Sequence, residues 1–201
     1  MKKMLAVMMA TLLSTAAMAA ETTGVNVEFE RERGTASPNT MTNTIKVAPF
    51  YQLGNGVKFD VQLSGGRDDG SVSGNNNAIS NSAEARVQYM YEVVPNFKLG
   101  GRVGVGQMFN GINQTTGNTV DFSYYTIEPK ASYNITPELT ALASWRFRDS
   151  FGSDNVEYQT RTWKAGFGYA VTKKDEVEVK YFEKRGDYST NGVELAYTRS
   201  F

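Results

Sequence analysis

The sequence predicts an all-β fold, a transmembrane antiparallel up-and-down β-barrel of about 10 strands. Three observations support this fold class: an N-terminal leader, ten runs in which polar and apolar residues alternate, and connections that are short and long in turn. Alternation with a period of two is typical of strands whose two faces meet different surroundings. Barrels of about 12 or about 8 strands are the less favoured alternatives.

The N-terminus has the three regions of a secretory signal peptide. Residues 1–3 are a basic start, residues 4–13 are an apolar run, and the small residues that follow end at Ala19. We therefore expect cleavage after Ala19, which makes residues 1–19 a signal peptide and residues 20–201 the barrel. The apolar run is about half as long as a membrane-spanning helix, and no later stretch is continuously apolar.

The composition excludes several classes of function. Removing Lys2 and Lys3 with the leader takes the chain from 21 basic and 21 acidic residues to 19 and 21, a net charge of about −2. Nucleic-acid binding needs a clustered excess of basic residues, so we exclude it. The chain has no cysteine and no histidine, so disulfides, metal triads and Ser-His-Asp sites lack their residues. We therefore predict no catalytic residue, no metal, no cofactor and no enzyme activity.

The ten alternating runs predict ten strands, several of them long enough to cross a membrane when tilted. Along residues 57–63 the odd-numbered positions are apolar, whereas the even-numbered positions include Lys58 and Asp60. Residues 83–93 repeat the pattern around Arg86. In chain order, the predicted strands are residues 24–32, 44–53, 57–66, 83–94, 97–109, 122–135, 139–149, 160–171, 176–184 and 192–201.

Proline and glycine mark four of these runs. Pro49 in the second run and Pro129 in the sixth lack the N–H that a closed sheet uses, so we expect a bulge or a local kink at each. Glycine recurs at inward positions of the fifth run, for example at Gly104 and Gly106, and of the eighth run. These glycines either leave space along the lumen, or they relieve curvature or admit the bulky side chain of a neighbour.

The connections between the runs are of two kinds. Short turns alternate in order with mostly longer, polar connections. This asymmetry is typical of outer-membrane barrels, in which short turns face the periplasm and long loops face outside. An even number of strands then brings both termini to the periplasmic side. The short turns are residues 53–56, 94–96, 135–138 and 172–175, and the other connections are residues 35–43, 67–82, 110–121, 150–158 and 185–191.

A soluble β-sandwich also has alternating strands, and the positions of the aromatic residues argue against it. They gather near both ends of the runs, as expected where a barrel crosses the two membrane interfaces. The aromatic residues are Tyr51, Tyr91, Phe97, Tyr133, Tyr169 and Phe201 near the short turns, and Phe109, Tyr125, Phe147 and Trp163 near the longer connections.

The last run ends in Phe201 and has apolar residues at alternate positions. It resembles the recognition signal of the barrel-assembly machinery, although Arg199 stands where an aromatic residue is usual. We therefore expect an outer-membrane location, the assembly machinery as a partner through this strand, and lipopolysaccharide and phospholipid as surroundings.

Charged residues of both signs occupy the predicted inward positions. One interpretation is a structural network that fills and rigidifies the lumen, since unpaired charges are costly there. The other is that unequal pairing leaves a basic wall that guides an anionic solute. The candidate residues for this solute path are Arg146, Arg148, Arg102, Lys130, Lys164 and Arg86.

Several short motifs resemble those of a known protein family. They include Asn55-Gly56 before a strand, the strand pair of residues 83–106, and Arg146-Phe147-Arg148. Through them, residues 55–147 resemble the oligogalacturonate-specific porin family of monomeric outer-membrane channels, which have twelve strands. The resemblance implies passive diffusion of anionic sugars along a basic track, to which Arg146 and Arg148 correspond.

We therefore predict an outer-membrane porin for passive diffusion of small anionic solutes, with acidic oligosaccharides as candidates. The alternative is a closed barrel that acts as an adhesin or an envelope-structural protein through its extracellular loops. The two differ in whether water has a continuous path through the lumen.

Overall fold

The computed structural model describes residues 21–35, 41–68, 79–112, 119–152, 159–186 and 189–201. The predicted signal peptide lies outside these residues, as do the middle parts of the longer connections. Among the described residues, no helix is long and apolar enough to span a membrane. The strands are β1 (Thr22–Gly34), β2 (Met41–Gln52), β3 (Lys58–Asp68), β4 (Ile79–Val94), β5 (Phe97–Ile112), β6 (Thr119–Asn134), β7 (Leu139–Ser150), β8 (Gln159–Ala170), β9 (Asp175–Gly186) and β10 (Thr190–Ser200).

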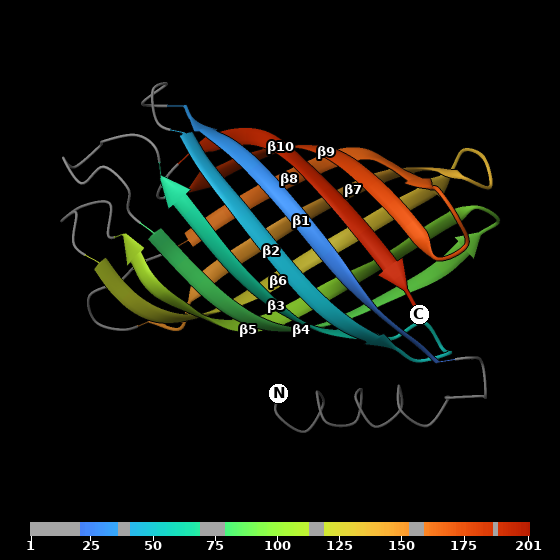
Figure 1. The fold of residues 1–201 in the computed structure, drawn as a ribbon, viewed down its shortest axis with the longest axis horizontal. Helices are drawn as coiled ribbons and strands as arrows, with labels where there is room; N and C mark the ends of the chain where they lie inside the picture. The colour runs from blue at the N-terminus through green and yellow to red at the C-terminus, as the bar shows by residue number, and fades with distance from the viewer. Residues whose placement is uncertain (1–20, 36–40, 69–78, 113–118, 153–158, 187–188) are drawn as a thin grey trace.

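The ten strands form a closed barrel in which each strand pairs antiparallel with its neighbours in the chain (Figure 1). The first and last strands close the sheet, because β1 pairs with β10 from Gly24 opposite Ser200 to Gly34 opposite Thr190. Closure leaves no strand edge, so every strand finds hydrogen-bond partners on both sides. The predicted ten-stranded antiparallel barrel is confirmed.

Short turns join the strands at one end of the barrel. In the first, the Leu53 N–H donates to the Val57 carbonyl at 2.8 Å, and Gly56 takes a φ of 87°. In the second, Asn96 takes a φ of 70°, a left-handed conformation that asparagine tolerates. The C-terminus and the start of β1 lie at this same end (Figure 1).

At the opposite end the strands are longer than the alternation predicts. β4 begins at Ile79 rather than at residue 83, and β5 ends at Ile112 rather than at residue 109. The side-chain pattern ends where the lipid-facing surface ends, but backbone groups pair in water as well as in lipid. The alternation of polar and apolar residues therefore does not predict the parts of strands that extend beyond the membrane.

Of the two features predicted at Pro49 and Pro129, a bulge or a local kink, the structure excludes the bulge. The residue pairs on either side of Pro49 belong to one register of β2 with β3, and the same holds for Pro129 between β6 and β7. Proline removes one N–H from a ladder, and this loss does not require an extra residue in the strand. The register shifts lie instead between Glu92 and Val94 and between Met108 and Gly111.

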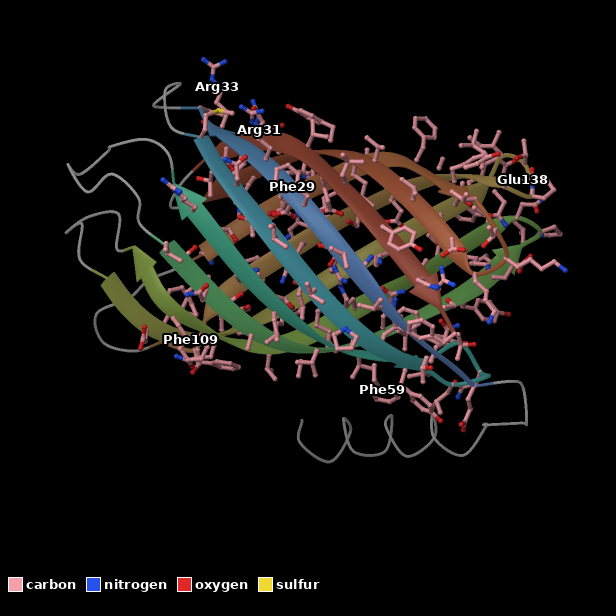
Figure 2. The ribbon with its side chains drawn as sticks, viewed as in Figure 1. Phe29, Arg31, Arg33, Phe59, Phe109 and Glu138 are labelled. Carbon is pink, nitrogen blue, oxygen red and sulfur yellow. The ribbon has the colours of Figure 1, made fainter. Side chains whose placement is uncertain are left out.

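The outer face of the barrel is apolar and the inner face is polar. Large apolar side chains are exposed around the barrel, among them Phe29, Phe59 and Phe109 (Figure 2). Soluble proteins do not expose a continuous apolar surface of this kind, so lipid must cover it. The buried polar and charged side chains, in contrast, all have even numbers and face the interior. A sandwich would bury its apolar face, so this arrangement excludes the soluble alternative.

Arg199, which departs from the usual C-terminal signal, has a structural partner at the short-turn end. Its Nη1 atom lies 3.1 Å from Oδ1 of Asp175, and the Tyr197 hydroxyl donates to the same oxygen at 2.6 Å. The arginine therefore ties β10 to the start of β9. Recognition of this strand by the assembly machinery stays a prediction.

Candidate functional site

The lumen is the candidate site, and all six residues predicted for the solute path lie in it. Arg146 on β7 contacts Glu84 on β4, and Lys164 on β8 contacts Glu30 on β1. Side chains from strands that are not neighbours can meet only inside the barrel. The other four predicted residues also line cavities in the lumen; they are Arg86, Arg102, Lys130 and Arg148.

Glu84 is the acceptor for a cluster of side chains in the half of the lumen near the longer connections. Its Oε2 atom lies 2.5 Å from Nη2 of Arg146 and 3.9 Å from Nη2 of Arg148. The Tyr124 hydroxyl donates to Oε2 at 3.2 Å, and the Thr126 hydroxyl donates to Oε1 at 2.7 Å. Only 2% of Glu84 is exposed. Two of the predicted path cations therefore share one buried carboxylate.

A second group of charges, the central cluster, lies in the middle of the lumen. Lys164 donates to Glu194 and, at 2.9 Å, to Oε1 of Glu30. Lys46 contacts Glu30 from the other side. The ammonium groups of three lysines thus supply the positive charge that three closely placed carboxylates need. The central cluster consists of Glu28, Glu30, Lys46, Lys164, Lys180 and Glu194.

Two further pairs connect neighbouring strands. Arg86 contacts Asp60, and both side chains are 3% exposed. Arg102 donates to Oε2 of Glu128 from Nε at 3.0 Å and from Nη2 at 2.5 Å. The predicted basic wall therefore exists largely as ion pairs rather than as free positive charge. Its role in a solute path stays a prediction.

Two lysines differ from the other cations that line the cavities. In the described part of the chain, neither Lys58 nor Lys130 has a carboxylate oxygen within ion-pair distance. Lys58 Nζ lies 3.9 Å from the centre of the Phe50 ring, and Lys130 Nζ donates to Oε1 of Gln88 at 2.8 Å. Both lysines line the same cavity, so this cavity holds positive charge that no acid neutralises directly.

Two cavities divide the lumen. The larger, about 310 Å³, lies toward the short turns, and the smaller, about 100 Å³, lies toward the longer connections. Lys46, Arg146 and Lys164 line both cavities, so these three side chains stand between them. We call these three residues the constriction. Arg146 and Lys164 are among the predicted path residues, whereas Lys46 is not.

Sequence reasoning missed the residues that hold the cations in place. Alternation correctly puts Glu84 and Lys46 on the inner face, but it does not show which strand each one reaches. Tyr124 carried a weak signal, since it is a large aromatic residue at an even-numbered, inward position. Its contact with Glu84 depends on the curvature of the closed sheet, which no local pattern contains.

Two of the inward glycines, Gly104 and Gly106, admit side chains of other strands and do not leave open space. A side-chain carbon at Gly104 would lie 2.5 Å from Oε1 of Glu84 and 2.8 Å from Oγ1 of Thr126. At Gly106 it would lie 2.5 Å from Cζ of Tyr124, whose ring covers this position. At Gly104 and Gly106 the structure supports the interpretation in which a neighbouring side chain fills the space.

Replacing Gly106 with alanine is expected to lower the free energy of unfolding by about 1–3 kcal/mol, the usual cost of overpacking. The added methyl group must displace Tyr124, which then loses its hydrogen bond to Glu84. Denaturant unfolding of the refolded protein in vesicles measures the change. Gly101→Ala is the matched control, because this glycine is on the outer face of β5 and its nearest neighbour would be 3.4 Å away. Equal effects at the two glycines would contradict the packing argument.

Comparison with known proteins places this fold among outer-membrane barrels. Residues 5–170 match the family described as outer membrane protein beta-barrel domain. No curated protein matches the sequence. The beta domain of the Bordetella autotransporter Brka has a TM-score of 0.59 at 12% identity, over 91% of this chain and 100% of that one. An outer membrane channel from Pseudomonas putida F1 has a TM-score of 0.59 at 10% identity, over 92% and 97%.

At these identities the solved structures are evidence for the fold alone. The KdgM porin in complex with disordered oligogalacturonate has a TM-score of 0.45 at 12% identity, over 89% of this chain and 99% of that one. A match at this level carries no argument. The resemblance to the oligogalacturonate-specific porins therefore stays a prediction.

Proposed function

Because this chain belongs to the outer membrane protein beta-barrel domain family, we propose that it is a narrow outer-membrane channel for small anionic solutes. The observation that carries the proposal is the pair of lumenal cavities that share Lys46, Arg146 and Lys164. In the described part of the chain, the barrier between the cavities is thus made of side chains. Side chains change rotamer much faster than a barrel unfolds, so such a barrier allows a water path to open.

The balance of charge in the cavities supports an anionic solute. Ten different basic and eight different acidic side chains line the two cavities, three of the basic ones being shared by both. A surplus of positive charge along a pore favours the entry of anions. Ten strands enclose less space than the sixteen of wide porins, so the solutes are small. Acidic oligosaccharides, which the sequence resemblance implies, belong to this class only as short, extended chains.

Replacing Lys58 and Lys130 together with glutamine is expected to shift the channel's selectivity away from anions. Among the described residues, these are the cavity-lining lysines that form no ion pair, so removing them takes away two positive charges without freeing a buried acid. The measurement is single-channel recording of refolded protein in planar bilayers, with the reversal potential under a KCl gradient. Galacturonate in place of chloride then tests an acidic sugar directly.

The matched control is Lys173→Gln/Lys174→Gln, which removes the same charge from the turn before β9, outside both cavities. We expect this variant to keep the reversal potential of the natural protein. Identical shifts in both double variants would show that the lumenal lysines have no special part in selectivity.

A second candidate function is a closed barrel that acts through its outer end. The observation that favours it is the extent to which lumenal charges pair across the barrel, for example in Glu84 with Arg146 and Lys164 with Glu30. The same recordings separate the two functions. Protein that is folded by circular dichroism but shows no discrete openings would contradict the channel and support the closed barrel.

A further inference from the structure

Exposed arginines gather on the outer face of the barrel at the end with the longer connections. They come from β1, β3, β8 and β9, and Figure 2 shows Arg31 and Arg33 at this end of β1, beyond Phe29. No lysine faces outward here among the described residues. We call these five residues the arginine belt: Arg31, Arg33, Arg67, Arg161 and Arg185.

Strand pairing places members of the belt close together. Arg161 on β8 lies directly opposite Arg185 on β9. Arg31 on β1 lies opposite Asn43 on β2, and Asn43 lies opposite Arg67 on β3. Like charges directly opposite each other destabilise a sheet. The Arg161–Arg185 pairing is therefore unfavourable unless an anion lies between the two guanidinium groups.

Among the described residues, little negative charge lies beside the Arg161–Arg185 pair. Arg185 contacts Oε1 of Glu183 at 2.6 Å, and the two side chains are 73% and 40% exposed. Arg161 donates from Nη2 to the neutral side chain of Gln159 at 3.2 Å. Within the described ranges, Glu183 is thus the acid that contacts this pair, and it contacts Arg185. A second anion is needed there to neutralise the charge of Arg161.

The belt borders the apolar surface that lipid covers. Trp163, the next outward residue after Arg161 on β8, is 63% exposed, and Phe29 holds the same position relative to Arg31. Guanidinium groups at this boundary lie at the level of lipid headgroups. Arginine also matches phosphate geometry, because its planar group donates two parallel hydrogen bonds to phosphate oxygens.

We propose that the arginine belt binds the phosphate groups of the phosphorylated glycolipid in the outer leaflet, with Arg161 and Arg185 sharing one phosphate. A phosphate between these side chains turns their repulsion into attraction. Exposed Trp163 beside the pair offers an apolar surface to the acyl chains of the same lipid. This favours a lipid over free phosphate. The proposal concerns the outer face and does not depend on conduction through the lumen.

The test is a titration of the refolded protein in neutral detergent micelles with diphosphoryl lipid A, followed by tryptophan fluorescence, since Trp163 lies beside the pair. We expect Arg161→Gln/Arg185→Gln to weaken binding about tenfold or more, as the charge-assisted hydrogen bonds to one phosphate are lost. Both side chains are exposed, so the double variant should fold. Heat-modifiable migration on gels checks this.

Lys173→Gln/Lys174→Gln is the matched control, because it removes two positive charges at the opposite end of the barrel. We expect it to bind diphosphoryl lipid A like the natural protein. Equal weakening in both double variants would overturn the proposal, as would equal affinity of the natural protein for dephosphorylated lipid A. Inorganic phosphate that binds as tightly as lipid A would overturn the assignment to a lipid.

Discussion

Replacing Glu84 with alanine is expected to lower the free energy of unfolding by about 3–5 kcal/mol, the cost of removing one partner from a buried ion pair. Glu84 is 2% exposed and holds Arg146 from across the lumen. The Tyr124 and Thr126 hydroxyls lose their acceptor in the same step. Unfolding by guanidinium chloride in phospholipid vesicles, followed by tryptophan fluorescence, measures the loss.

Two further variants make this prediction specific. Glu183→Ala removes the acid of an exposed pair, for which we expect less than about 1 kcal/mol. Glu84→Ala/Arg146→Ala removes both partners of the buried pair, and we expect it to be less destabilised than Glu84→Ala alone, because it leaves one fewer cation unneutralised. If Glu84→Ala and Glu183→Ala cost the same, the buried cluster does not stabilise the barrel.

Removing Lys164 and Glu194 together is expected to raise the single-channel conductance several-fold. Lys164 belongs to the constriction, and its ammonium group links β8 to Glu30 on β1 and to Glu194 on β10. Truncating both members of the Lys164–Glu194 pair to alanine widens the narrowest layer while the net charge of the lumen stays the same. The two cavities then join, so ions meet a shorter barrier. Planar-bilayer recordings in KCl measure the change.

Glu92→Ala/Lys98→Ala is the matched control for this experiment. These residues form a cross-strand pair at the short-turn end, where they line neither cavity. The control also removes one acid and one base, but away from the constriction, so we expect its conductance to stay at the natural level. An unchanged conductance in Lys164→Ala/Glu194→Ala would show that the constriction does not limit flow.

The strand pattern could be predicted from the sequence because it is a local property. Successive side chains of a strand point to opposite faces, so the polarity of every second residue matches the surroundings of one face. The inward positions predicted for Lys58, Asp60 and Arg86 are therefore correct. Of the bulge or local kink predicted at Pro49 and Pro129, the bulge is wrong, because the same register holds on both sides of each proline.

The partners of the lumenal charges could not be predicted, because they depend on closure. Glu84 and Arg146 are 62 residues apart and lie on β4 and β7, strands that do not pair. The two side chains meet because the closed sheet points both toward the barrel axis, at the same height along that axis. The same geometry decided between the two interpretations of Gly106, since only the path of Tyr124 shows that the space is filled.

The sequence by itself determined that this chain forms an antiparallel barrel of ten strands, with a charged interior and an apolar exterior, since each of these properties repeats along the backbone with a period of two. Only the tertiary structure decided which charges neutralise one another, that Lys46, Arg146 and Lys164 divide the lumen, and that Lys58 and Lys130 lack an acidic partner among the described residues. The physical reason is that ion pairing falls steeply with distance, and distances across a lumen follow from curvature and strand tilt.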